Sequence, residues 1–204
     1  MTRIKICGVT SIEQAIGCVE RGVDAVGVNF VPSSPRRVDI PSAKAIALAV
    51  GSRALIVAVV ADLGVEAMQL LRRETGAGCL QLHGNEEPGT LLPLLPHAYK
   101  AIRVATDDDV AAAERIPGDY IMVDAKVAGA LGGTGHTFDW SLVTGLARRR
   151  RLVLGGGLTS ANVASAIAIV RPWCVDVSSG VESSPGIKDL AKVEDFVRSV
   201  RRAG

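Results

Sequence analysis

The stretch LVLGGGLTSANV (152–163), followed by CVDVSSGVESSPGIKD (174–189), decides the fold of this chain. In each half, an apolar and β-branched run stops at glycines or serines, and a helical pattern follows. The first run ends at Gly155, Gly156 and Gly157, and the second at Ser178, Ser179 and Gly180. Glycines let a ligand approach the backbone closely, and helix N-termini attract anions. The two loops therefore predict a phosphate site of the kind that follows strands 7 and 8 of a (β/α)₈ barrel.

Short apolar runs along the rest of the chain agree with this fold. Eight can be counted: IKIC (4–7), AVGVNF (25–30), ALIVAVV (54–60), GCLQLH (78–83), AYKAIRV (98–104), DYIMVD (119–124), RLVLG (151–155) and CVDVS (174–178). Most are apolar on both faces, which is typical of parallel strands covered on both sides. Helical patterns between them predict right-handed crossovers. An open doubly wound sheet is the alternative, but the even spacing favours a single α/β domain over 1–204, a closed (β/α)₈ TIM barrel.

The connecting helices are predicted from apolar periodicity and capping residues. A capping box, Thr10-x-x-Glu13, is expected to begin the first helix, and Pro41 to begin a helix over 41–50. Further helices are expected around 65–71, 86–95, 107–114, 139–147, 163–170 and 190–200. The run Arg148 to Arg151 is expected to cap a helix C-terminus. Two long connections, 31–40 and 125–138, are left, and long loops are usually functional or disordered.

The composition limits the class of function. The chain has 204 residues, 48% of them hydrophobic, and a net charge of +2 with scattered basic residues. This charge argues neither for nor against nucleic acid, and we expect no such partner. The four cysteines, Cys7, Cys18, Cys79 and Cys174, form no CxxC pair, so we expect no metal site and no disulfide. We see no signal peptide and no apolar run of about 18 residues. A cytoplasmic protein without membrane contact is therefore expected, and the sequence leaves open whether it is a monomer or a homodimer.

The chemistry is expected at the carboxyl ends of the strands, where barrel enzymes place it. Those ends carry Cys7, Gln81, His83, Arg103 and Asp124. Cys7 is either a small buried residue or a base, and a base would need a thiol pKa lowered from about 8.5. Asp124 either caps the following loop or acts as a general acid, which requires a carboxyl group that holds its proton near neutral pH. His83 is either a ligand-binding group or a structural hydrogen-bonding residue.

Two loops add further candidates. Arg36, in PSSPRR after the second strand, is suited to a carboxylate or a phosphate, and a solvated loop cation is the alternative. Gly132, Gly133 and Gly135 would let the backbone after Asp124 fold close to the site. Of all these features, the pair of Gly/Ser loops is the strongest signal.

Taken together, the motifs resemble the phosphoribosylanthranilate isomerase family over essentially the whole chain. They are KICGVT (5–10), GVNFVPSSPRRV (27–38), LQLHG (80–84), KAIRV (100–104), VDAKVAGALGGTGHTFDW (123–140), LGGGLTSANV (154–163) and VDVSSGVESSPGIKD (175–189). The resemblance implies a barrel without cofactor that takes part in tryptophan biosynthesis. The implied reaction is the Amadori rearrangement of N-(5-phosphoribosyl)anthranilate, a small phosphoribosyl substrate, to 1-(2-carboxyphenylamino)-1-deoxyribulose 5-phosphate.

The same resemblance implies roles for individual residues. Cys7 would be the general base, Asp124 the general acid, and Arg36 the partner of the anthranilate carboxylate. The glycines and serines of the last two loops would hold the phosphate. Gln81, His83 and Arg103 are expected to contact the substrate from the remaining strand ends.

Other functions are weighed against this one. The bifunctional histidine/tryptophan isomerases resemble barrels with an aspartate where Cys7 stands. Indole-glycerol-phosphate synthase would need a catalytic lysine in the pocket, and we expect Lys5 to lie on the opposite face of its strand from Cys7. A non-catalytic sensor of phosphoribosyl ligands is the alternative from a different class, and nothing in the sequence requires it.

Overall fold

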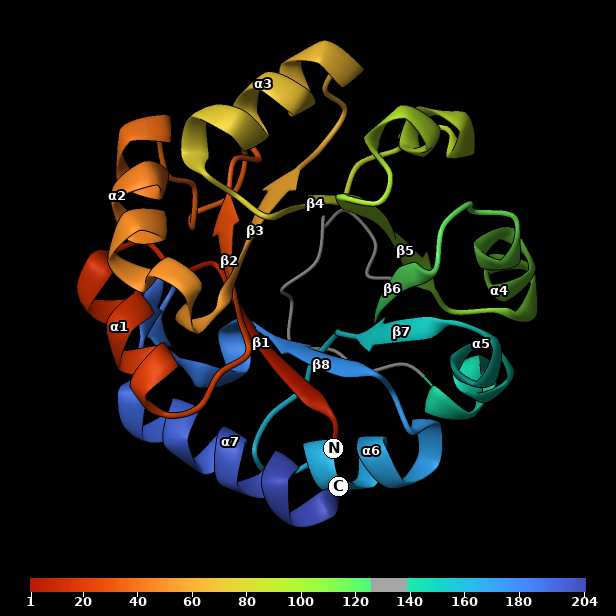
Figure 1. Cartoon of the computed structure of the whole chain (residues 1–204). Coiled ribbons are helices and arrows are strands. Elements are labelled where there is room, and N and C mark those ends of the chain that lie inside the picture. Colours follow the sequence, from red (N-terminus) through yellow and green to blue (C-terminus); the bar gives the residue numbers. More distant parts are fainter. Residues whose placement is uncertain (126–138) are drawn as a thin grey trace.

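Eight parallel strands close into a barrel in the computed structural model of the chain, which describes residues 1–125 and 139–204 (Figure 1). They are β1 (Arg3–Cys7), β2 (Ala25–Asn29), β3 (Leu55–Val60), β4 (Cys79–Leu82), β5 (Ala98–Val104), β6 (Tyr120–Ala125), β7 (Arg151–Leu154) and β8 (Cys174–Val177). Strands adjacent in sequence are adjacent in the barrel, and β1 pairs with β8 to close it. The predicted TIM barrel is confirmed, and each strand end lies within one residue of the predicted run.

Helices surround the barrel on its outer side (Figure 1). They are α1 (Ile12–Glu20), α2 (Ile40–Val50), α3 (Val65–Thr75), α4 (Asp107–Glu114), α5 (Thr144–Arg149), α6 (Val163–Val170) and α7 (Leu190–Ala203), with 3₁₀ segments η1 (Gly51–Arg53), η2 (Pro88–Leu94), η3 (Trp140–Val143) and η4 (Ser179–Val181). Arg148 and Arg149 lie in the last turn of α5, as expected. Among the described residues, no helix is both long enough and apolar enough to cross a membrane.

Two helix predictions need correction. The segment expected as a helix at 86–95 is the 3₁₀ segment η2, because Pro93 inside it has no N–H to donate to an α-helical ladder. The capping box at Thr10 was wrong by one residue. Ser11 caps α1 by accepting a hydrogen bond from the N–H of Gln14 at 3.3 Å. The Thr10 hydroxyl instead donates to the carbonyl of Gly186 at 2.7 Å.

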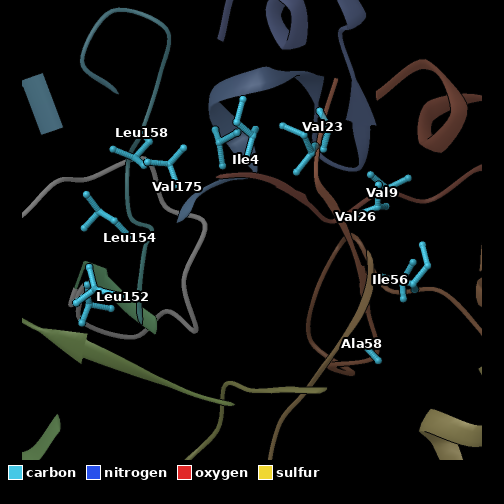
Figure 2. Close-up of a cluster of buried hydrophobic side chains, with 14 of the residues drawn as sticks. Ile4, Val9, Val23, Val26, Ile56, Ala58, Leu152, Leu154, Leu158 and Val175 are labelled. Carbon is cyan, nitrogen blue, oxygen red and sulfur yellow. The ribbon is translucent and has the colours of Figure 1, made fainter. Parts of the chain in front are cut away.

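The side chains of each strand divide between two cores, because alternate residues point to opposite faces. One face packs outward beneath the helices, as Figure 2 shows for Ile4, Val26, Ile56 and Leu154. The other face fills the barrel with Ala25, Val57, Tyr99, Ala101, Met122, Val153 and Cys174. Because both faces are buried, the strands form continuous apolar runs in the sequence. Polar side chains on the inward face appear mainly toward the carboxyl ends, where the candidate site lies.

A small antiparallel hairpin follows β8 and was not predicted. It consists of β9 (Glu182–Ser184) and β10 (Ile187–Lys188), and Gly186 in its turn has a φ of +84°. The bond from Thr10 ties this turn to the loop after β1. The hairpin thereby brings Glu182 and Lys188 to the rim of the barrel. The loop that carries Gly132, Gly133 and Gly135 lies outside the described residues.

Candidate active site

A cavity of about 370 Å³ opens at the carboxyl ends of the strands. The predicted site residues that line it are Cys7, Arg36, Gln81, His83, Asp124, Gly156, Gly157, Ser178 and Ser179. They come from positions throughout the chain, and the barrel brings them together because the carboxyl ends of parallel strands meet at one face. Asn29, Met122, Leu158 and Asp176 also contribute to the lining. Gly155, Gly180 and Arg103 were also predicted as site residues, but they are not part of the lining.

One side of the cavity consists of the loops after β7 and β8. Gly156 and Gly157 have φ angles of +88° and +64°, which glycine adopts without strain. Within the described residues, their N–H groups donate no hydrogen bond to the protein. The N–H of Gly155 donates to the carbonyl of Val123 at 2.8 Å, so the expected free donor at this position is not present. In this loop, the N–H groups of Gly156 and Gly157 are therefore the backbone donors suited to an anion.

Close packing holds the two loops together. A Cβ atom on Gly180 would lie 2.0 Å from the carbonyl oxygen of Leu158, so this position requires glycine. The Asn162 side chain fixes the first loop, since its amide donates to the carbonyl of Gly157 at 2.9 Å and its oxygen accepts from the N–H of Thr159 at 2.8 Å. Asn162 was not singled out from the sequence, although an asparagine just before an apolar helical run is a recognisable capping signal.

Cys7 lies on the floor of the cavity, at the end of β1. Burial raises the pKa of its thiol, against the opposing positive charges of Lys5 and Lys188. The lowered thiol pKa that a base would need is therefore not present in the free protein. Lys5 was expected on the opposite face of the strand from Cys7, and this was wrong. Positions 5 and 7 differ by two, so both side chains point into the barrel. Nζ of Lys5 lies 2.9 Å from Oδ1 of Asp176, and Lys5 is 2% exposed.

Asp124 lies at the end of β6 and is 4% exposed. Its Oδ2 is 3.5 Å from Nε2 of His83. His83 is oriented by Gln81, whose Nε2 lies 2.8 Å from Nδ1 of the imidazole, and the Gln81 oxygen accepts from the Tyr99 hydroxyl at 2.8 Å. With the Gln81 amide donating to Nδ1, the neutral imidazole carries its proton on Nε2, toward Asp124. The geometry thus joins Gln81 and His83 to the carboxylate.

Arg36 lies in the loop after β2, lines the cavity and contacts the hairpin. Its Nε and Nη2 donate to the two carboxylate oxygens of Glu182 at 2.8 and 2.7 Å. Glu182 also accepts from Nζ of Lys188 at 2.6 Å. Burial alone would raise the pKa of Glu182, but the hydrogen bonds and charges of Arg36 and Lys188 hold it below its ordinary value. Glu182 was missed because its partner is 146 residues away in the sequence.

Two further residues complete the surroundings. Gly8 has a φ of +75°, and a Cβ atom there would lie 2.3 Å from Cδ of Arg36, so glycine makes room for this arginine. Arg103 donates through Nη2 to the carbonyl of His83 at 3.3 Å and supports the end of β4. Its expected contact with a substrate stays a prediction. Among the described residues, no group of three or more His, Cys, Asp or Glu side chains is placed to hold a metal ion.

The fold and the cavity together define a class: (β/α)₈-barrel enzymes in which ionisable side chains face two loops that are suited to an anion. Comparison with known proteins narrows this class. The model of the N-(5'-phosphoribosyl)anthranilate (PRA) isomerase family matches residues 4–199. An N-(5'-phosphoribosyl)anthranilate isomerase of Pseudomonas putida is 41% identical over 203 residues, which cover 98% of each chain.

Solved structures agree with this result. The crystal structure of phosphoribosyl anthranilate isomerase from Thermotoga maritima has a TM-score of 0.91 and 36% identity, covering 99% of this chain and 100% of that one. A phosphoribosyl anthranilate isomerase in complex with reduced 1-(o-carboxyphenylamino)-1-deoxyribulose 5-phosphate has a TM-score of 0.89 and 34% identity, with the same coverage. The chain therefore belongs to the N-(5'-phosphoribosyl)anthranilate isomerase family, the isomerases of tryptophan biosynthesis.

Proposed function

We propose that this chain, as one barrel domain over 1–204, catalyses the Amadori rearrangement of N-(5'-phosphoribosyl)anthranilate by general acid–base catalysis. The observation that carries the proposal is that Cys7 and Asp124 line the same cavity as Gly156, Gly157 and the serines after β8. A related isomerase binds a reduced form of the rearranged product. An acid, a base and an anion site around one cavity are the groups that this reaction requires.

The first step needs an acid at the furanose ring oxygen. Asp124 in its protonated form would give its proton to that oxygen, and the C1–O bond would break to leave a Schiff base with the anthranilate nitrogen. The carboxylate formed in this step would lie 3.5 Å from Nε2 of His83. An imidazole N–H directed at the new negative charge stabilises it. Gln81 and Tyr99 would act through His83 rather than on the substrate.

The second step needs a base at carbon 2 of the ribose. The Cys7 thiolate would take that proton, the electrons of the C–H bond would move toward the iminium nitrogen, and the enolamine would tautomerise to the ketone. Positioned acids and bases each contribute about 10²–10⁴-fold to the rate. No redox group enters this sequence, because the carbon skeleton gains and loses only protons.

The remaining contacts would hold the substrate in place. Gly156, Gly157, Ser178 and Ser179 would bind the phosphate, with Gly155 and Gly180 shaping the loops. Phosphate binding energy is remote from the reacting carbons, so it orients the substrate. Arg36, oriented by Glu182, would bind the anthranilate carboxylate. Arg103 would contribute from the rim.

The test follows anthranilate fluorescence as freshly generated phosphoribosylanthranilate is consumed. Wild-type protein should abolish the signal, and Cys7→Ala should slow its loss by at least about 10²-fold. Cys79→Ala, at the other end of the barrel interior, is the matched control and should behave as wild type. Near wild-type turnover by Cys7→Ala would disprove the assignment. Tight substrate binding by the wild type without a fluorescence change would favour the sensor.

A further inference from the structure

The Lys5–Asp176 ion pair is a pair of enclosed charges that the proposed reaction does not use. Lys5 and Asp176 are 2% and 6% exposed, and Nζ lies 2.9 Å from Oδ1. The nearby residues inside the barrel are mainly apolar, such as Ala25 on the adjoining strand β2 and Val57 on β3. Burying charges is costly, and an apolar pair of similar volume often gives equal or greater stability. Stability alone therefore does not account for this pair.

The position of the pair directs attention to Cys7. Lys5 precedes Cys7 by two residues on β1, and both side chains point into the barrel. Asp176 faces Lys5 in the register of β8 with β1, and Gly27 faces Cys7 in the register of β2 with β1. A Cβ atom on Gly27 would lie 3.0 Å from Sγ of Cys7 and 3.1 Å from Nζ of Lys5. The ammonium and the thiol therefore lie within about 6 Å of each other, on either side of the space that a side chain at position 27 would occupy.

We propose that Lys5, held in place by Asp176, is a positioning residue that stabilises the thiolate of Cys7. An ammonium group within about 4–6 Å of an acid favours the ionised form of that acid. The thiolate is the form that accepts a proton, so this inference rests on the proposed role of Cys7 as the base. Burial alone would lower the pKa of Lys5, but Asp176, through its charge and hydrogen bond, and Cys7 together hold it above its ordinary value. Lys5 therefore remains charged beneath the thiol.

Other charged groups face Cys7 from the surrounding elements. Lys188 on β10 also favours the thiolate, and Asp176 on β8 opposes it. Arg36 reaches the same cavity from the loop after β2, and Asp124 lines it from β6. Lys188 and Arg36 both share the carboxylate of Glu182, which offsets part of their charge. Lys5 acts on Cys7 more strongly than Asp176 does. Its removal should therefore leave the thiol markedly less acidic.

The test measures the thiolate directly and needs no turnover. The rate at which iodoacetamide alkylates Cys7 is followed against pH in the substrate-free protein, and mass spectrometry of the Cys7 peptide separates it from the other three cysteines. Lys5→Met should move the midpoint of this profile upward by at least about one pH unit. The acid limb of kcat/KM against pH should move in the same direction.

The matched control is Lys100→Met. Lys100 on β5 is another buried lysine, 6% exposed and paired with Glu86 at 3.0 Å, and it points outward from the barrel. Its removal should lower stability without moving the Cys7 midpoint. If Lys5→Met does not fold, the double variant Lys5→Met with Asp176→Leu removes both charges and avoids an unpaired buried carboxylate.

The double variant should still raise the Cys7 midpoint, because the effect of Lys5 on the thiol exceeds that of Asp176. An unchanged midpoint in a folded variant without Lys5 would overturn the inference. The proposed function fails by a different result, wild-type turnover by Cys7→Ala. The two outcomes are independent, since alkylation reports the charge state of the thiol whether or not the thiol is the base.

Discussion

Two parts of the cavity lining are built from different groups. On the side of β7 and β8, the candidate anchor consists of backbone and small side chains at Gly156, Gly157 and the two serines. Around the rest of the cavity, ionisable groups depend on partners: Asp124 lies against His83, and Arg36 is bound to Glu182. The loops require a particular backbone shape, and the ionisable groups require specific partners. The loops and the Arg36–Glu182 pair should therefore determine substrate affinity, and Asp124 the rate.

The largest effect is expected on the ionisable side. Asp124→Asn removes the proton that the ring oxygen needs, so kcat should fall by about 10²–10⁴-fold. KM should change little, because the phosphate loops are intact. Asp119→Asn, an exposed carboxylate just before β6, serves as the control and should be silent. A large rise in KM with kcat retained would show that Asp124 belongs to the binding side instead.

The second prediction concerns the anchor. Gly157 has a φ of +64°, and an alanine in this conformation costs about 1–2 kcal/mol. Relief of that strain would move the N–H groups of the loop, so Gly157→Ala should raise KM about tenfold with a smaller change in kcat. The measurement is a steady-state fluorescence assay over a range of substrate concentrations.

Gly76→Ala provides a control for strain alone. Gly76 ends α3 with a φ of +71°, and a Cβ atom there would meet only Cβ of Ala47, at 3.7 Å. This variant should lose a similar amount of stability in thermal unfolding and keep the wild-type KM. If both glycine variants raise KM equally, the loop after β7 has no special part in binding.

The third prediction tests whether Arg36 depends on its partner. Glu182→Gln weakens the two-point contact with Arg36 and leaves the charges of Arg36 and the buried Lys188 less compensated. We expect KM to rise several-fold, since hydrogen bonds to charged groups are worth about 1.5–3 kcal/mol. Glu194→Gln is the matched control, because Glu194 pairs with Arg198 on the exposed face of α7. An unchanged KM in Glu182→Gln would show that Arg36 needs no such partner.

These contrasts also explain what could be predicted from the sequence. The strands were found because both of their faces are buried, and the glycines of the anchor because a φ near +64° or +88° favours that residue. Cys7 and Asp124 could be found because each ends an apolar run. All of these signals are local in the sequence.

The partners of the ionisable groups left no local signal. Lys5 and Asp176 are 171 residues apart, and their contact exists only because β8 closes on β1. Glu182 lies on a hairpin too short to show a strand pattern. For Lys5, the alternation of a strand should have placed it beside Cys7, and the error lay in assigning opposite faces to residues two apart.

The smallest effect should come from acid. Because Arg36 and Lys188 hold the pKa of Glu182 below its ordinary value despite burial, the ionised carboxylate stabilises the fold at pH values above its unfolded pKa of about 4.3. That contribution is lost as the pH falls through the lower pKa of the folded state. The free energy of unfolding, measured with urea, should therefore fall by the same amount in wild type and Glu194→Gln when the pH is lowered from about 6 to about 3. It should fall less in Glu182→Gln.

Parallel losses in all three proteins would show that the Arg36–Glu182–Lys188 cluster adds no acid-dependent stability. A smaller loss of stability in Glu182→Gln would instead show that the ionisable part of the cavity lining responds to acid through Glu182. Gly156, Gly157, Ser178 and Ser179 have no side chain that titrates in this range. Acid should therefore weaken the Arg36–Glu182–Lys188 cluster before it affects the backbone of the glycine and serine loops.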